Sequence, residues 1–142
     1  MTSREGELFE QQIGHPQTQT KKRIVVKVGS SLLASADHLK PCYAFMHGLL
    51  SDIANLQQQG YEVVLASSGS VALGLNALNA DIETAGVQEK QAAAACGQPI
   101  LLNAYKQIAL EYGFDIAQVL VTSDDLEERR RFLNTKNTVH TL

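Results

Sequence analysis

The sequence has no tryptophan, only two cysteines and three prolines, and no long apolar run. Cys42 and Cys96 lie far apart, without a Cys-x-x-Cys motif or a secretory signal, so we expect free thiols in a reducing cytoplasm. No apolar stretch approaches the roughly 20 residues that a membrane-spanning helix needs. The four histidines show no ligand spacing. These absences argue against a disulfide scaffold, a membrane protein and a histidine metal site.

Charge and known nucleotide motifs are also scarce. The formal net charge is -3, which gives no reason to expect nucleic acid or an anionic membrane as a partner. There is no Gly-x-x-x-x-Gly-Lys-Ser/Thr loop, no Gly-x-Gly-x-x-Gly fingerprint and no Gly-x-Ser-x-Gly elbow. With 142 residues, of which 44% are hydrophobic, the chain has the length of one domain with a real core.

The segment 23–31, Arg-Ile-Val-Val-Lys-Val-Gly-Ser-Ser, combines a strand with a polar turn. Its β-branched run predicts a strand buried on both faces of a parallel sheet. A buried ammonium is costly unless an anion meets it, so Lys27 is predicted to point past the strand end toward an anionic ligand. Gly29 would let backbone amides approach that ligand, and Ser30 adds a hydroxyl donor. The segment fits equally a strand whose lysine reaches solvent before an ordinary turn.

A second turn of the same kind follows a second predicted strand. The spacing of apolar residues predicts a helix over 41–60, and β-rich residues predict a strand over 61–66. Such a βαβ unit makes the two strands parallel neighbours. Both strands then end at one sheet edge, so the Gly29 turn and the Ser68-Gly69 turn should lie side by side, where open α/β sheets bind ligands. Ser68 also fits a plain cap of the helix predicted after Gly69.

The rest of the chain is predicted to be mainly helical. We expect a long helix over 84–112, with an alanine run that allows close packing and a kink or break near Pro99. Residues 114–121 predict a third strand, and 122–142 predict a capped helix that is still unfinished at the last residue. The polar residues 1–22 predict a flexible extension without chemistry. The expected class is α/β with a parallel sheet.

Four blocks of the sequence follow one another within residues 23–142. They are Val-Val-Lys-Val-Gly-Ser-Ser-Leu-Leu at 25–33, Ser-Ser-Gly-Ser-Val-Ala-Leu-Gly at 67–74, Lys-Gln-Ala-Ala-Ala-Ala-Cys-Gly-Gln at 90–98 and Arg-Phe-Leu-Asn at 131–134. Together they resemble the N-terminal portion of the bacterial glutamate 5-kinases, within the amino acid kinase family. Four blocks in order are far more specific than one. Aspartokinases and N-acetylglutamate kinases share the first loop, whereas the last two blocks favour the glutamate 5-kinases.

This resemblance implies an incomplete αβα sandwich around a parallel sheet. It implies ATP-dependent phosphorylation of the γ-carboxylate of L-glutamate, with Mg²⁺, as the first step toward proline. Lys27 would then be the catalytic residue at the transferring phosphate, and Gly29 and Ser30 would also bind ATP phosphate. Ser68 and Gly69 would bind glutamate. The resemblance further implies a homo-oligomer for the full-length protein.

The resemblance also implies what these residues leave out. An acidic and an amide ligand for glutamate, a second phosphate-binding lysine and the nucleotide-binding segment would lie beyond residue 142. We therefore expect no activity from these residues alone. Two alternatives stay open: a non-catalytic, truncated α/β module that at most binds a partner subunit, and another acyl-phosphate kinase that acts on aspartate or N-acetylglutamate.

Overall fold

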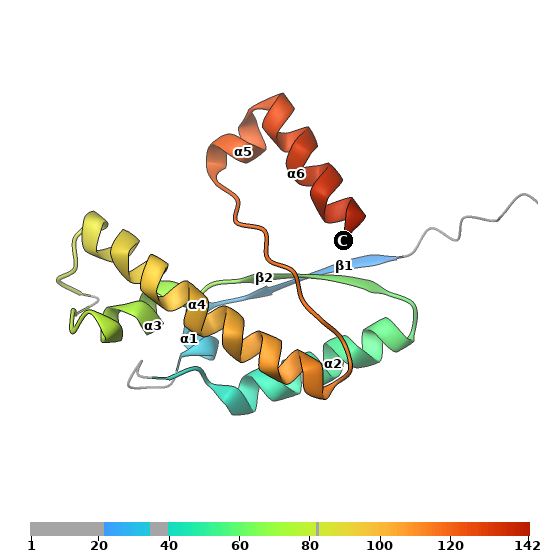
Figure 1. Ribbon diagram of the computed structural model, residues 1–142, viewed down its shortest axis with the longest axis horizontal. Coiled ribbons are helices and arrows are strands. Elements are labelled where there is room, and N and C mark those ends of the chain that lie inside the picture. Colours follow the sequence, from blue (N-terminus) through green and yellow to red (C-terminus); the bar gives the residue numbers. More distant parts are fainter. Residues whose placement is uncertain (1–21, 35–39, 82) are drawn as a thin grey trace, which may run out of the picture.

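The computed structural model describes residues 22–34, 40–81 and 83–142 (Figure 1). The predicted extension over 1–22 lies outside these residues except for Lys22. The elements are β1 (Arg23–Val28), α1 (Ser30–Leu33), α2 (Tyr43–Gln58), β2 (Glu62–Ser67), α3 (Ser70–Ala77), α4 (Val87–Glu111), α5 (Ser123–Glu127) and α6 (Arg129–Thr141). The predicted α/β class is confirmed. None of the helices that the structure describes is long and apolar enough to cross a membrane.

The strands β1 and β2 pair in parallel, in a register that runs from Arg23 opposite Glu62 to Val28 opposite Ser67. The chain between them contains α2, so the predicted βαβ unit is confirmed. Figure 1 shows α1, α2 and α4 on one side of this sheet. On the other side α6 contacts the start of β1, and Val25 is 67% exposed. The predicted burial of the first strand on both faces is therefore wrong within the described residues.

The main core lies between this sheet and the helices. Its four largest fully buried aliphatic side chains come from α1, α2, α3 and α4, and a fifth, Met46, comes from α2. The aliphatic four are Leu33, Leu50, Leu73 and Ile108. Burial of one such side chain stabilises the fold by about 1.5–3 kcal/mol. The apolar spacing that predicted a helix over 41–60 is confirmed by α2, which ends before Gly60, a residue with φ of 85°.

The helices α3 and α4 touch backbone to backbone. A Cβ atom at Gly97 would lie 1.8 Å from the carbonyl oxygen of Ser70, and one at Gly74 would lie 1.7 Å from the carbonyl oxygen of Ala93. Ala93 has no exposed surface, which confirms the close packing predicted for the alanine run. Only glycine can occupy the two crossing positions without moving a helix.

The helix α4 runs without interruption through Pro99, so of the predicted kink or break the break is wrong, and the kink stays a prediction. Proline removes one hydrogen bond to the carbonyl of the residue four positions earlier, which is Ala95. Both residues are exposed, so water can satisfy that carbonyl. The opposite side of α4, with Leu101 and Ile108, is buried in the main core and keeps the helix in place.

The strand predicted over 114–121 is also wrong, because residues 114–122 form neither strand nor helix. A strand needs a hydrogen-bonded neighbour, and the sheet of the described residues contains only β1 and β2. Phe114 and Ile116 pack against the main core, whereas Leu120 is 73% exposed. Residues 114–121 thus have β propensity but pair with neither β1 nor β2.

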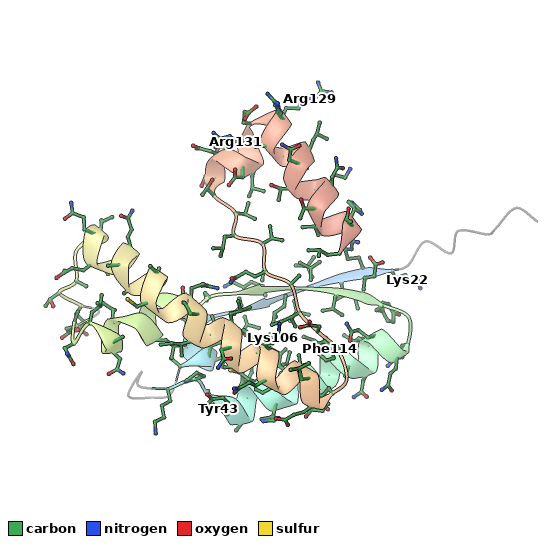
Figure 2. All side chains as sticks on the ribbon, in the orientation of Figure 1. Lys22, Tyr43, Lys106, Phe114, Arg129 and Arg131 are labelled. Atoms are coloured by element: carbon green, nitrogen blue, oxygen red, sulfur yellow. The ribbon has the colours of Figure 1, made fainter. Side chains whose placement is uncertain are left out.

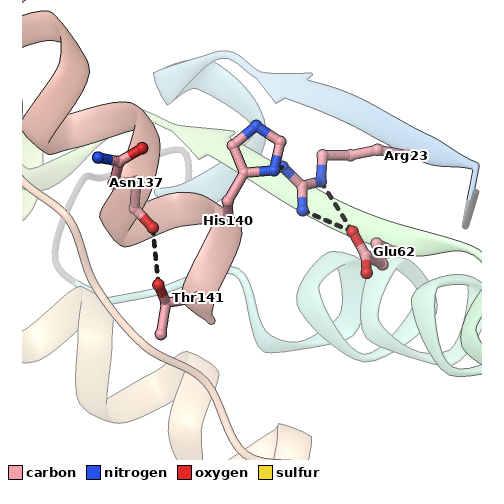
Figure 3. A network of polar contacts seen from close by, with 5 residues as sticks. All are labelled: Arg23, Glu62, Asn137, His140 and Thr141. Carbon is pink, nitrogen blue, oxygen red and sulfur yellow. Dashed lines mark hydrogen bonds and ion pairs between the residues drawn. The ribbon is translucent and has the colours of Figure 1, made fainter.

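The segment predicted as one helix over 122–142 forms two, α5 and α6, which are divided at Glu128. Its predicted cap is confirmed: the Asp125 amide donates to Thr122 Oγ1 at 3.4 Å, and the Thr122 amide donates to Asp125 Oδ2 at 2.9 Å. Neither helix contains a buried residue. Figure 3 shows the contact of α6 with the sheet, where Arg23 Nη1 lies 3.2 Å from His140 Nδ1.

Arg23 also joins the two strands at their first paired position. Its Nε and Nη2 atoms donate to Oε2 of Glu62 at 3.0 and 2.6 Å (Figure 3). The pair lies at the start of both parallel strands, the end opposite to the turns that follow Val28 and Ser67. It therefore fixes the register without taking part in the candidate site.

Candidate functional site

The turn after β1 and the turn after β2 lie against each other, as predicted. Ser68 donates twice to the carbonyl oxygen of Val28, from its amide at 3.3 Å and from Oγ at 3.1 Å. A Cβ atom at Gly69 would lie 3.3 Å from Leu33 Cβ and 3.8 Å from Ser30 Cα. The parallel register places both strand ends at one edge, and these contacts close the gap between the two turns.

Gly69 forms the sharp connection from β2 into α3. Its φ of 108° lies in the left-handed region, where a side chain is strained. Its carbonyl oxygen accepts the hydrogen bond from the Leu73 amide at 3.1 Å, so Gly69 is the N-cap residue of α3. Among the described residues no side chain caps this helix. The interpretation of Ser68 as a plain helix cap is therefore wrong, because its hydroxyl bonds to Val28 instead.

Neither the backbone conformation nor the packing of the described residues requires glycine at Gly29. Its φ of -79° and ψ of 157° are ordinary extended values, which any residue adopts. A Cβ atom at Gly29 would meet no described atom within 4 Å. Space therefore lies open above the first turn, next to the exposed Ser30. This open space and hydroxyl fit the approach of a phosphate group, because oxygen anions are bound by backbone amides and hydroxyl donors.

Lys27 lies on the open face of the sheet, one residue before the end of β1. The expectation of an ammonium buried among valines is wrong, because Lys27 is exposed. In the described parts of the chain, Lys27 forms no ion pair, so its charge is available to an anion. Its predicted direction past the strand end stays a prediction. The strand places this cation two residues from Gly29.

The hydroxyl of Ser68 has a defined role as a donor. A carbonyl oxygen only accepts, so the Ser68 proton is directed to Val28. The lone pairs of Ser68 Oγ are left to accept a hydrogen bond from outside. An ammonium group is such a donor, whereas a carboxylate would have to displace the Val28 contact. Ser68 in this position therefore suits the amino group of an amino acid.

Sequence reasoning missed the contact that supports this serine from behind. Tyr105 on α4 has its hydroxyl 3.0 Å from Ser67 Oγ, and Ser67 Oγ donates to the carbonyl oxygen of Ser68 at 3.2 Å. Burial raises the pKa of Tyr105, and the hydrogen bond with Ser67 lowers it by less. The sequence marks Tyr105 only as an apolar position of a helix, so no local signal could have shown this pair.

The resemblance implies two groups, ATP and Mg²⁺, and the residues of the two turns fit the phosphate of ATP better than the metal ion. The first turn, with Lys27, Gly29 and Ser30, offers the cation, the open space and the hydroxyl that a phosphate needs. For a metal ion the fit is poor: nowhere in 22–34, 40–81 and 83–142 do three His, Cys, Asp or Glu side chains gather. We therefore assign no ligand of Mg²⁺ to these residues.

The chain matches known proteins over most of its length. The amino acid kinase family matches residues 22–142. A glutamate 5-kinase of Trichlorobacter lovleyi is 44% identical over 124 residues, which are 87% of this chain and 33% of the relative. Those of Ruegeria sp. and Cereibacter sphaeroides are 42% and 41% identical over 123 and 127 residues, which are 87% and 89% of this chain and 33% and 34% of the relatives.

These matches confirm the resemblance that the four sequence blocks carry. The chain spans about a third of the length of the curated relatives that it matches. The family match, in contrast, takes in almost the whole chain and every described helix and strand. The chain belongs to the amino acid kinase family.

Proposed function

We propose that this chain forms the phosphate- and glutamate-binding edge of a kinase that transfers the γ-phosphoryl group of ATP to the γ-carboxylate of L-glutamate. The observation that carries the proposal is the contact between the two turns, where Ser68 bonds to Val28 and Gly69 packs on Leu33. This contact places the turn with Gly29 and Ser30, which suits a phosphate group, beside Ser68, which suits the amino group of an amino acid. The relatives named glutamate 5-kinase support the choice of substrate.

Phosphoryl transfer asks the protein mainly for position and charge neutralisation. A γ-carboxylate oxygen of glutamate attacks the γ-phosphorus, and the bond from that phosphorus to the bridging oxygen breaks to release ADP. A glutamate side chain with a pKa of about 4.3 is already ionised at neutral pH, so no general base is needed. Mg²⁺ accompanies ATP and lowers its charge when bound.

The residues of the two turns divide this work. Lys27 faces the transferring phosphoryl group and reduces its negative charge. Gly29 leaves room for the phosphate oxygens above the first turn, and Ser30 donates a hydrogen bond to them. Ser68 accepts from the amino group of glutamate, and Gly69 lets the second turn approach the substrate. The two carboxylates of glutamate find their remaining partners elsewhere in the enzyme.

Three further predictions belong to this proposal. We place the protein in the cytoplasm, which suits the free thiols of Cys42 and Cys96. The first step of proline biosynthesis is the reaction that follows from the substrate. Assembly into homo-oligomers stays a prediction of the resemblance.

The test is a trapping assay on a chimera, in which residues 23–142 replace the matching third of the Trichlorobacter lovleyi relative. Hydroxylamine converts γ-glutamyl phosphate into a coloured hydroxamate. We expect the chimera to form it from ATP, Mg²⁺ and L-glutamate. Lys27→Ala should lower kcat by about 10²–10³, as the loss of one charge-stabilising donor does. A chimera without activity would contradict the proposal and favour the non-catalytic module.

Lys22→Ala is the matched control. Lys22 is an exposed lysine just before β1, so it lies at the opposite end of the same strand (Figure 2). Removal of its charge should leave kcat unchanged. Equal losses in the two variants would show a general effect of charge and would contradict the role of Lys27.

The acceptor decides between the members of the family. With L-aspartate or N-acetylglutamate in place of L-glutamate, we expect little hydroxamate. N-acetylglutamate is the sharper comparison, because its nitrogen carries no positive charge and has lost most of its capacity to donate to Ser68. Faster reaction with either competitor would assign the chain to another acyl-phosphate kinase.

A further inference from the structure

We propose that Tyr105 is a positioning residue for the glutamate site: through Ser67, its hydroxyl fixes the turn that presents Ser68. The inference rests on the proposed function, because it gives Ser68 its role at the substrate. Tyr105 itself lies on α4, behind the turn, and we assign it no contact with substrate or phosphate.

The contacts form a short relay of hydrogen bonds. Tyr105 OH lies 3.0 Å from Ser67 Oγ, Ser67 Oγ lies 3.2 Å from the Ser68 carbonyl oxygen, and Ser68 Oγ lies 3.1 Å from the Val28 carbonyl oxygen. A serine hydroxyl has one proton, and Ser67 gives it to the Ser68 carbonyl. Tyr105 must therefore be the donor to Ser67. Each hydroxyl thus has one direction, and the relay ends at the first turn.

The relay starts from a rigid point. Tyr105 is 6% exposed and belongs to the main core, together with its α4 neighbours Leu101 and Ile108. Burial raises its pKa above the usual value, so the hydroxyl keeps its proton at neutral pH and remains a donor. An anchor of this kind holds the turn in one arrangement at little cost in entropy.

The position of Ser67 directs the hydrogen bonds of the relay to the turn that contains Ser68 and Gly69. Ser67 is the last residue of β2, opposite Val28, and side chains alternate along a strand. Ser67 therefore faces the helices with Leu65, and the next residue turns toward the first loop. Loss of the Tyr105 hydroxyl would leave the fold in place but let the Ser68–Gly69 peptide, which carries the Ser68 carbonyl, rotate. Ground-state binding of glutamate should suffer, and the chemical step should not.

The kinetic test uses the chimera and Tyr105→Phe, which removes only the hydroxyl. We expect KM for L-glutamate to rise about two- to ten-fold, as for one lost hydrogen bond, with kcat and KM for ATP unchanged. Tyr112→Phe is the matched control, because Tyr112 also donates to a carbonyl, that of His47 at 3.3 Å, but away from the turns. A merely structural role would lower kcat or move both KM values.

Variants of Ser67 test the relay itself. Ser67→Ala should reproduce the effect of Tyr105→Phe, and the double variant should add little to either. Ser67→Thr keeps a hydroxyl and should restore a low KM for glutamate. Additive effects in the double variant would overturn the relay.

Amide hydrogen exchange on the chain itself gives a readout without activity. The Ser68 amide is bonded to Val28, and Tyr105→Phe should speed its exchange while core amides of α4 keep their protection. Unchanged exchange at Ser68, or loss of protection throughout the core, would overturn the positioning role. A parent chimera that forms no γ-glutamyl phosphate would contradict the proposed function alone, and the exchange result would then decide this inference.

Discussion

The crossing of α3 and α4 makes a strong prediction about Gly97. In Gly97→Ala the added Cβ would stand 1.8 Å from the Ser70 carbonyl oxygen and 2.7 Å from the Gly74 amide nitrogen. Both atoms are backbone of another helix, so no side chain can rotate away. Ordinary contact begins near 3.4 Å, and the helices would have to separate. Ser70 directly follows Gly69, so the second turn would move with α3.

The magnitude follows from two opposing terms. Alanine in place of glycine inside a helix is worth about 1 kcal/mol in intrinsic propensity. Overpacking of a tight contact costs about 1–3 kcal/mol and sometimes more. Because the clash falls on backbone, we expect the upper part of that range, and a net loss of about 2 kcal/mol in the free energy of unfolding.

Gly48→Ala provides the same chemical change with the opposite expected sign. Gly48 lies within α2, where a Cβ atom would meet nothing within 4 Å. That variant should gain about 0.5–1 kcal/mol. Urea unfolding followed by far-UV circular dichroism measures both variants against the parent chain, with m-values compared to check the two-state assumption. Parental or higher stability of Gly97→Ala would contradict the predicted backbone clash between α3 and α4.

Three further predictions follow from single residues. Gly69→Ala should cost about 1–3 kcal/mol, because its φ of 108° is strained for alanine and Leu33 lies 3.3 Å away; urea unfolding measures it, and a neutral result would contradict the strain. Burial raises the pKa of Tyr105 above 10.0, so as the pH rises the unfolded state loses this proton before the folded state does. The free energy of unfolding should therefore fall as the pH rises through and above that value, and it should fall less in Tyr105→Phe. Urea midpoints measured against pH test this, and equal pH profiles of the two proteins would contradict it. The Thr122 hydroxyl lowers the pKa of Asp125, and an NMR titration should find that pKa closer to normal in Thr122→Val.

The first half of the fold could be predicted because its signals are local. An apolar run, a helical spacing and a glycine turn each lie within a few residues, and together they fix the parallel pair and the meeting of the two turns. The contact of Ser68 with Val28 follows from that register. The meeting of the two turns was therefore predictable, whereas the exposure of Lys27 was not, and the roles of the site residues stay predictions.

The failures share a different cause. The segment 114–121 has β propensity but finds no strand to pair with, and Val25 has a valine's preference for burial but no layer above it. Pro99 is tolerated because the carbonyl that loses its hydrogen bond belongs to Ala95, an exposed residue that water can reach. The Ser67–Tyr105 pair joins residues 38 positions apart, and the pattern of a single helix contains no trace of it. Each depends on what tertiary structure places nearby.

The most direct test of the central claim is amide chemical-shift mapping of the isotope-labelled chimera with millimolar ATP and then L-glutamate. We expect that ATP shifts the amides of Gly29 and Ser30, that glutamate shifts those of Ser68 and Gly69, and that Lys27→Ala weakens the first response. Shifts confined to α5 and α6, or none at either turn, would contradict the claim that the two turns form one site.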